Sequence, residues 1–178
     1  MAIQAIWGRM LRAVRGEVSL FEEVEHDPGA TAEAILVVAI GAISVGLGFG
    51  LSLSVFARPG NYLPALVGSV VSTLLAYAVF SGVVYLVGTR VFGGTASWEE
   101  VLRTLGYAYS PLAVGVVAIV PFLGWLIVAV AALWALYLAY VAMRAALDLD
   151  GGRTAATIVL AIIPAWIINS LIGAIVRL

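Results

Sequence analysis

Three groups of residues have types and spacings that could do chemistry. Ser44 stands among glycines between residues 41 and 50, as the nucleophile of an intramembrane serine protease would. Such a nucleophile needs a partner base, and the single histidine, His26, lies outside the apolar runs. Small residues at 42, 46 and 50 have the spacing typical of closely packed membrane helices. Packing is therefore the preferred interpretation.

The other two groups are acidic and could bind a cation. Asp148 and Asp150 precede Gly151, as in half of a calcium loop or beside a phosphatase nucleophile. No later bidentate acid follows, which a calcium loop requires. The run Glu22 to Asp27 could hold a divalent cation, but acids ahead of a helix N-terminus are favourable without one. We therefore predict no catalytic residue, no metal site and no cofactor, and expect residues 148–152 to form a solvated turn.

Uncharged polar residues inside the apolar runs are a further candidate site. In the second run they recur at every fourth position, and in the third they lie just before Pro111, which should kink the helix. A polar cleft for a lipid headgroup or small solute would be formed by Tyr77, Ser81, Tyr85, Thr104, Tyr107, Ser110 and Asn169. The favoured alternative is that these groups fix the bundle through interhelical hydrogen bonds of roughly 0.5–1 kcal/mol each.

The composition defines the elements that must position these residues. Of 178 residues, 63% are hydrophobic and only 11% are charged, against about 45–50% and about 25% in soluble domains. A chain this short cannot bury that excess, so its solvent is apolar. A membrane span needs about 20 residues, and the apolar runs lie at about 31–56, 62–90, 99–120, 123–147 and 154–176. The sequence predicts an all-α integral membrane protein with five transmembrane helices.

Local signals indicate where some helices begin. Asp27-Pro28 has the pattern of an N-cap acid followed by proline. Ser97 and Glu100 have the spacing of a capping box, and Glu99 and Arg103 have that of a favourable ion pair one turn apart. Residues 121–124 carry no charge, so a tight hairpin between the third and fourth spans is expected.

Residues 2–16 are predicted to form an amphipathic helix ahead of the spans. Trp7 and other apolar residues recur at helical spacing, while Arg9, Arg12 and Arg15 fall on another side. This pattern is typical of a helix in the membrane interface, with arginines toward anionic headgroups. The alternative is a helix packed on the protein's own cytoplasmic face. The predicted division is a cytoplasmic segment, 1–26, and a transmembrane domain, 27–178.

The arginines predict the orientation. In a five-span chain, seven lie on the side of the N-terminus and only Arg58 and Arg177 lie on the other. The positive-inside rule then places the N-terminus in the cytoplasm and the C-terminus outside. The net charge of −1 and the lack of cysteine give no support for nucleic-acid binding, disulfides or thiolate sites.

Several short motifs, in order, resemble the Yip-one domain family, named from Ypt-interacting protein. They are Phe21-Glu22-Glu23 with Asp27-Pro28, Val91-Phe92-Gly93-Gly94-Thr95 with Trp98, Tyr107-Ala108-Tyr109-Ser110-Pro111, Pro121-Phe122-Leu123-Gly124-Trp125, and Asp150-Gly151-Gly152-Arg153-Thr154 before Pro164. The resemblance covers about residues 15–175. It implies five spans, a cytoplasmic N-terminus and a membrane adaptor rather than an enzyme.

Eukaryotic relatives in this family associate with Rab-type GTPases and with one another in Golgi and endoplasmic-reticulum membranes. This chain has a short N-terminal segment and no Asp-Leu-Tyr-Gly-Pro motif, and it looks like the short prokaryotic members, for which a Rab partner is implausible. The leading hypothesis is a non-enzymatic protein of a prokaryotic plasma membrane that binds lipids and other membrane proteins or itself. The alternative is a small-solute or ion transporter or channel that uses the polar cleft.

Overall fold

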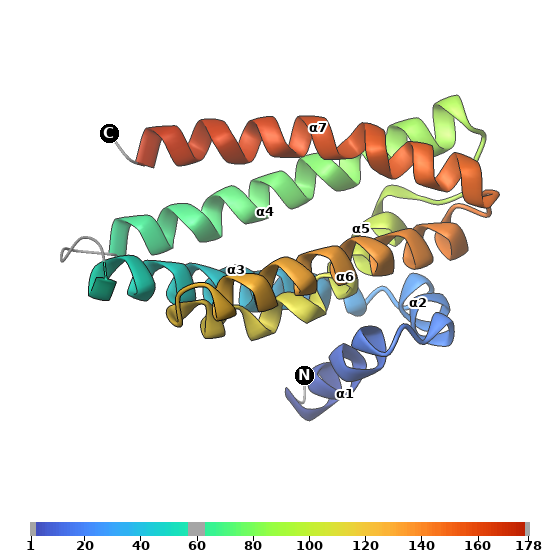
Figure 1. Cartoon of the computed structure of the whole chain (residues 1–178). Coiled ribbons are helices and arrows are strands. Elements are labelled where there is room, and N and C mark those ends of the chain that lie inside the picture. Colours follow the sequence, from blue (N-terminus) through green and yellow to red (C-terminus); the bar gives the residue numbers. More distant parts are fainter. Residues whose placement is uncertain (1–2, 57–62, 177–178) are drawn as a thin grey trace.

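The structure is a computed structural model that describes residues 3–56 and 63–176, and every regular element within those ranges is a helix (Figure 1). The elements in chain order are α1 (Ile3–Val14), α2 (Val18–Glu25), α3 (Ala30–Phe56), α4 (Leu63–Leu86), a π-helical turn η1 (Val87–Val91), α5 (Trp98–Ala108), a 3₁₀ segment η2 (Ser110–Ile119), α6 (Leu123–Ala146) and α7 (Gly151–Val176).

Five of these stretches are long and apolar enough to cross a membrane. They are Ala30–Phe56, Leu66–Val91, Trp98–Ile119, Leu123–Ala146 and Gly151–Ile172. Each overlaps one predicted apolar run, and the ends differ by only a few residues. The predicted all-α class with five candidate spans is therefore confirmed.

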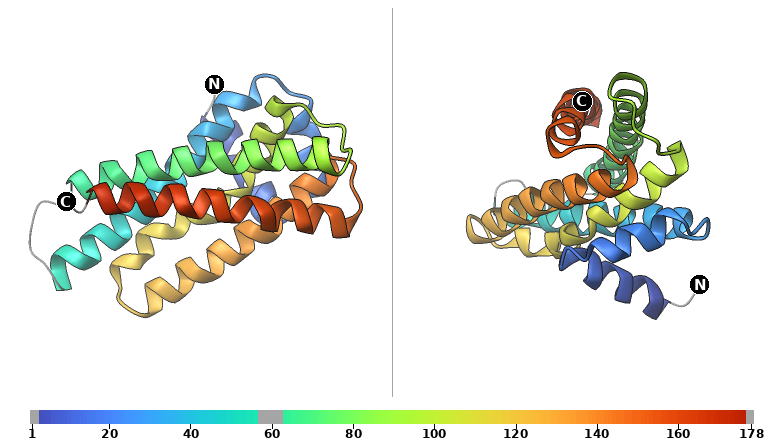
Figure 2. Two further views of the ribbon diagram at one scale, coloured as in Figure 1. Left: turned by 90° about the horizontal axis from the view of Figure 1, so that it is seen from above. Right: turned by 90° about the vertical axis from the view of Figure 1, so that its right-hand side faces the viewer.

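The spans form two layers (Figures 1 and 2). Helices α4 and α7 lie side by side as one layer, while α3, η2 and α6 form the other. Helix α7 packs mainly against α4 and touches α6 much less. Helices α1 and α2 lie against the second layer, at the end of the bundle where α5 begins.

The largest buried side chains gather around α5. Tyr107 and Leu105 of α5 are completely buried, together with Phe21 of α2 and with Leu138 and Met143 of α6. Helix α5 and η2 form the most buried span, and α7 forms the least buried. Because a membrane helix can face lipid, the exposed apolar side chains of α7 need no protein partner.

The third span changes helix type at Pro111, where the sequence predicts a kink. Helix α5 ends at Ala108, and Ser110–Ile119 continues as 3₁₀ helix. Proline has no N–H for the carbonyl one turn earlier, and the Ser110 hydroxyl donates to the Tyr107 carbonyl over 2.6 Å. The Tyr107 carbonyl, one turn before Pro111, is thus satisfied by a hydroxyl.

Ser44 of α3 completes this arrangement from the neighbouring helix. Its hydroxyl donates to the Ala113 carbonyl over 2.7 Å and accepts from the Val116 N–H over 2.9 Å. Backbone groups inside a bilayer must be satisfied within the protein. Ser44 therefore has a structural partner on each side, which agrees with packing rather than with a nucleophile.

The capping signals are confirmed at some helix starts and shifted at others. Ser97 and Glu100 form the predicted capping box at the start of α5. Helix α3 begins at Ala30 rather than at Pro28, and the Asp27 carboxylate instead accepts from the Gly29 N–H over 2.9 Å.

The acidic turn before α7 also has a structural role. Asp150 accepts from the N–H groups of Gly152 and Arg153, so α7 begins three residues earlier than predicted. Asp148 accepts from the Thr95 hydroxyl over 2.9 Å, which links this turn to the loop before α5.

Glycines let α3 and η2 approach closely. A Cβ on Gly48 would lie 2.2 Å from the Gly115 carbonyl oxygen, and a Cβ on Gly115 would lie 2.5 Å from the Val45 backbone nitrogen. Backbone atoms cannot move aside as a flexible side chain can. The packing interpretation of the α3 glycines is confirmed at this contact.

We expect Gly115→Val to destabilise the bundle, because the new side chain would force α3 and η2 apart, at a cost of about 1–3 kcal/mol. The measurement is the midpoint of thermal unfolding in detergent micelles. Gly8→Val is the matched control, since nothing lies within 4 Å of a Cβ at Gly8. Equal midpoints for the two variants would contradict this account of the contact.

Candidate functional site

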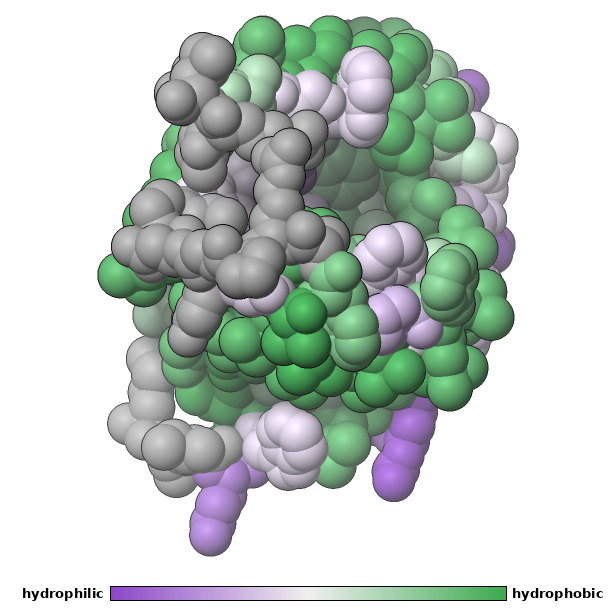
Figure 3. Space-filling view, turned by 60° about the vertical axis from the view of Figure 1, so that its left-hand side comes forward, coloured by the Kyte–Doolittle hydropathy of each residue, from purple (hydrophilic) through white to green (hydrophobic). Residues whose placement is uncertain are grey.

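All charged residues in the described ranges lie at the same end of the bundle, where α1 and α2 are found. They belong to α1, α2, the start of α3, the end of α4 with η1, α5, the end of α6 and the start of α7. Viewed from the other end, the described surface is mostly hydrophobic (Figure 3). Any site that uses charge is therefore at the end formed by α1, α2 and α5.

Arg9 of α1 is the centre of an ion-pair cluster, named here the Arg9 cluster. Its guanidinium donates to Glu23 over 3.1 Å, to Asp27 over 2.8 Å and to Glu33 over 2.8 Å. The Tyr107 hydroxyl donates to the same Glu33 oxygen over 2.6 Å. One arginine thus joins α1 to α2, to the segment before α3, to α3 itself and, through Glu33, to α5.

Arg12 extends the cluster one turn further along α1. It donates to Glu17 over 3.0 Å and to Glu23 over 2.6 Å. Burial alone lowers the pKa of Arg9, but hydrogen bonds to Glu33 and Asp27 outweigh this effect and raise it. Both arginines remain charged at any physiological pH.

Arg103 fastens α2 to α5 in a different way. It is almost fully buried, and its guanidinium donates to the carbonyls of Val24 over 3.1 Å and of Glu25 over 2.5 Å. These carbonyls form the C-terminal end of α2, where a helix carries partial negative charge. The predicted Glu99–Arg103 pair is wrong, because the arginine turns toward these carbonyls instead.

The structure places the predicted membrane-interface residues in two groups. Arg9 and Arg12 face carboxylates of their own chain rather than pointing away from it. Trp7 is 55% exposed and Arg15 is largely exposed, with only a 3.9 Å contact to Glu17. Two arginines therefore fit the packed alternative, and the position of α1 relative to a bilayer stays a prediction.

Helices α1 and α2 also share the core of the transmembrane bundle. The buried side chains of these two helices, which belong to the same hydrophobic cluster as α5 and α6, are Ile6, Met10, Ala13, Leu20, Phe21 and Val24. The indole N–H of Trp134 on α6 donates to the Val14 carbonyl over 2.8 Å. The described part of the predicted cytoplasmic segment, residues 3–26, thus contacts the bundle along much of its length.

Helices α4 and α5 meet through two tyrosines of α4. The Tyr77 hydroxyl donates to the Leu102 carbonyl over 2.5 Å. The Tyr85 ring packs edge-on against Trp98, with ring centroids 6.1 Å apart. Tyr77 and Tyr85 of α4 thus both contact the third span.

The seven residues of the predicted polar cleft do not line one common space. Thr104 donates to the carbonyl of Glu100 within its own helix, and Tyr107 points to Glu33 on α3. Ser110 satisfies the Tyr107 carbonyl, as described above. Ser81 is buried without a hydrogen-bond partner. The hydroxyls of Tyr77 and Tyr107 bond to another helix, as the favoured alternative expects, whereas those of Thr104 and Ser110 bond within their own span.

Asn169 is separate from the other six. It lies on α7 and lines a cavity between α4, α6 and α7. Tyr109, on the wall of the same cavity, was not among the predicted site residues. Its position beside Tyr107 and Ser110 was visible in the sequence, but the direction of its side chain was not.

The pairing of Arg9 with Glu23, Asp27 and Glu33 was not predicted from the sequence. A weak signal was available, since Glu33 is an acid inside the first turn of an apolar helix, where an unpaired charge is costly. Its partner lies 24 residues away, and local spacing does not predict contacts across that separation.

We expect Arg9→Gln to lower the thermal unfolding midpoint, because Glu33 and Asp27 would lose their charged partner, at a cost of roughly 1–3 kcal/mol. Arg15→Gln is the control, since that side chain is 72% exposed and should leave the midpoint unchanged. A midpoint for Arg9→Gln equal to that of Arg15→Gln would argue against the Arg9 cluster as the tie between α1 and α3.

The Arg9→Gln variant should also differ from the wild-type protein in how its stability depends on acidic pH. The hydrogen bond from Arg9 lowers the pKa of Asp27, and that from Arg12 lowers the pKa of Glu23. A lowered folded-state pKa gives stabilisation that is complete above the unfolded value of about 4 and is lost as the pH falls through the folded value. As the pH is lowered from 5 to about 3, the thermal unfolding midpoint should therefore fall more steeply for the wild-type protein than for Arg9→Gln.

Comparison with known proteins identifies the family. The sequence matches the Yip1 domain over residues 18–174, which includes α2, Arg103 and all five candidate spans. No curated protein sequence and no solved structure gives a significant match. The match covers nearly the whole chain and agrees with the order of motifs noted above, so the chain belongs to the Yip1 domain family.

Proposed function

We propose that this chain is a non-enzymatic membrane adaptor that binds other membrane proteins or itself and organises the surrounding bilayer. The observation that carries the proposal is the surface formed by α1 and the start of α2. The charged groups beneath it are paired within the chain, while an apolar row remains exposed above them.

The exposed fractions in that apolar row are 55% for Trp7, 43% for Leu11, 37% for Val14 and 48% for Val18. The first three share one face of α1 because they are three and four residues apart, and Val18 begins α2 after the turn at Gly16. An exposed tryptophan is typical of interfaces. We name Trp7, Leu11, Val14 and Val18 the α1 row.

Rigidity supports the same proposal. The Arg9 cluster and Arg103 hold α1 and α2 on the bundle, so the α1 row is presented without the cost of ordering a free segment on binding. In the proposed orientation this end is cytoplasmic, and the α1 row meets the inner leaflet or a partner at the level of that leaflet. The exposed Arg15 then lies near anionic headgroups.

Membership of the family supports an adaptor, while a Rab-type GTPase as partner comes only from family analogy and is not proposed. The transporter alternative receives no support from the contacts of Tyr77, Thr104 and Ser110, because their hydroxyls are occupied by backbone carbonyls. We place the protein in a prokaryotic plasma membrane.

The proposal predicts that partners depend on the α1 row. Purification in a mild detergent should recover a stoichiometric partner with the wild-type protein, or a homo-oligomer, and Leu11→Ser should lose it. Gln4→Ser is the control, since Gln4 is also exposed on α1 but lies outside the row. Equal recovery with both variants, or solute flux through liposomes containing the pure protein, would contradict the proposal.

The proposed orientation can be tested separately by labelling. The chain has no cysteine, so single cysteines can replace Gly94, Gly151, Asn61 or Leu178, the last two of which lie outside the described residues. A membrane-impermeant maleimide applied to intact cells should reach only positions 61 and 178. Labelling at position 94 or 151 would contradict the proposed orientation.

A further inference from the structure

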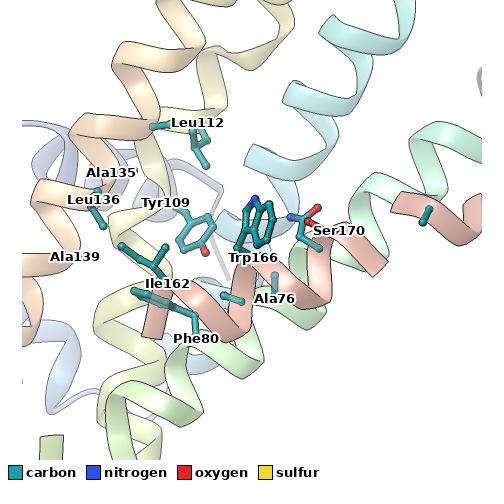
Figure 4. Close-up of a pocket in the computed structure, with 14 residues that line it drawn as sticks. Ala76, Phe80, Tyr109, Leu112, Ala135, Leu136, Ala139, Ile162, Trp166 and Ser170 are labelled. Carbon is teal, nitrogen blue, oxygen red and sulfur yellow. The ribbon is translucent and has the colours of Figure 1, made fainter. Parts of the chain in front are cut away.

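A cavity of about 600 Å³ lies between the two layers of the bundle. Its walls come from α4, η2, α6 and α7, and all lining residues belong to the candidate membrane spans or to the end of α7. Figure 4 shows Tyr109, Ile162 and Trp166 around the same space. Figure 3 shows a recess between the layers, surrounded mainly by hydrophobic residues.

The cavity follows from small side chains at a loose contact. Six of its fourteen lining residues are alanines, on α4, α6 and α7. Because α7 packs mainly on α4 and touches α6 much less, nothing fills the space that these alanines leave. A cavity of this size falls in the range of ligand sites, about 300–1,000 Å³.

The walls define what the cavity can accept. No charged residue lines it, and most lining side chains are aliphatic or aromatic. Four side chains there can form hydrogen bonds: Tyr109, Trp166, Asn169 and Ser170. None of the four makes a side-chain hydrogen bond to another described residue, and Figure 4 shows the Tyr109 hydroxyl directed into the space.

Polar groups without partners are costly in hydrocarbon. Water can satisfy them only if it enters between apolar walls. An occupant that is mostly apolar but carries an uncharged hydrogen-bonding group would both satisfy these polar groups and fill the alanine-lined space. A charged headgroup would have to remain outside.

The depth of Asn169 indicates the source of such an occupant. It lies seven residues before the end of α7 at Val176, which is about 10 Å along the helix axis. Helix α7 is about 39 Å long, longer than the hydrocarbon core of about 30 Å, so Asn169 lies a few ångströms inside the hydrocarbon boundary. Acyl chains join their polar linkage close to that depth.

We propose that this cavity binds one acyl chain of a membrane lipid from the leaflet at the Val176 end, with its uncharged ester or hydroxyl group on Asn169 and Ser170. The chain enters between α6 and α7 and lies against Trp166, Leu136 and Phe80. This site is separate from the α1 row, because the cavity lies between the two layers, whereas α1 lies on the side of the bundle away from α4 and α7 (Figures 1 and 2).

The test uses the full-length protein in phosphatidylcholine vesicles that contain a phosphatidylcholine with a photoreactive diazirine in its acyl chain. After illumination, mass spectrometry locates the attached lipid. Labels should concentrate on lining residues such as Phe80 and Ala139, which are only 7% and 5% exposed, compared with Leu133, which is 68% exposed on the outside of α6.

Ala132→Trp fills the cavity from an exposed lining position, and Ala129→Trp places the same residue one turn away, outside the lining. Labelling of the cavity should fall about fivefold in Ala132→Trp, equal to about 1 kcal/mol of binding free energy, and stay unchanged in Ala129→Trp. Asn169→Leu should reduce it as well. Thermal unfolding of each variant shows that the fold is retained.

Two results would overturn the proposal. Labels spread evenly over Leu133 and the cavity residues in the wild-type protein and all three variants would mean that only surrounding lipid contacts these residues. An efficient disulfide between copies of Ser170→Cys, together with unlabelled cavity residues, would mean that a second copy covers the recess. Loss of partner binding by Leu11→Ser would leave this result unaffected, so the two proposals can fail separately.

Discussion

The hydrocarbon core of a bilayer accepts neither an unpaired backbone group nor an unpaired charge, and this constraint explains most of the structure. It requires helices for all five spans and keeps the described charges at one end of the bundle. Where Pro111 ends the α-helix of the third span, the same constraint requires other donors and acceptors. Ser110 and Ser44 supply them, with contacts to Tyr107, Ala113 and Val116. Ser44, the serine among glycines, thus has a structural role, because its hydroxyl satisfies backbone groups of the third span.

At the polar end the constraint acts through charge. Glu33 lies inside the first turn of a membrane span, and it is stable there because Arg9 and Tyr107 both donate to it. Since Arg9 also binds Glu23 and Asp27, pairing this one carboxylate fixes α1 and α2 on the bundle. Arg103 adds a second attachment at the carbonyl end of α2. The interaction surface that we propose is therefore a consequence of neutralising an acid near the membrane boundary.

The two layers of the bundle differ in how tightly they pack. Between α3 and η2, glycines bring backbones into contact, and a single Cβ at Gly48 or Gly115 has no space. Between α6 and α7, alanines face one another across a gap, and Tyr109 and Asn169 lie on its walls. Small residues thus produce opposite results. They allow close approach between α3 and η2, and they leave a cavity where α7 is held mainly by α4.

The sequence by itself determined the membrane class, the five spans, the capping box at Ser97 and the family, because each depends on composition or on residues close together in the chain. Helix starts at Asp27 and Asp150 were predicted only within a few residues, since their carboxylates can bind several nearby N–H groups. Only the tertiary structure decided that Arg9 binds Glu33 rather than lipid headgroups, and that Arg103 binds the C-terminal carbonyls of α2 rather than Glu99. It also decided that Tyr107 bonds to Glu33 while Asn169 lines the cavity. These pairings join segments far apart in the chain. Each of these polar side chains could bind water, a lipid headgroup or another part of the protein. The packing of the helices decides which of these it meets, and the residue type does not.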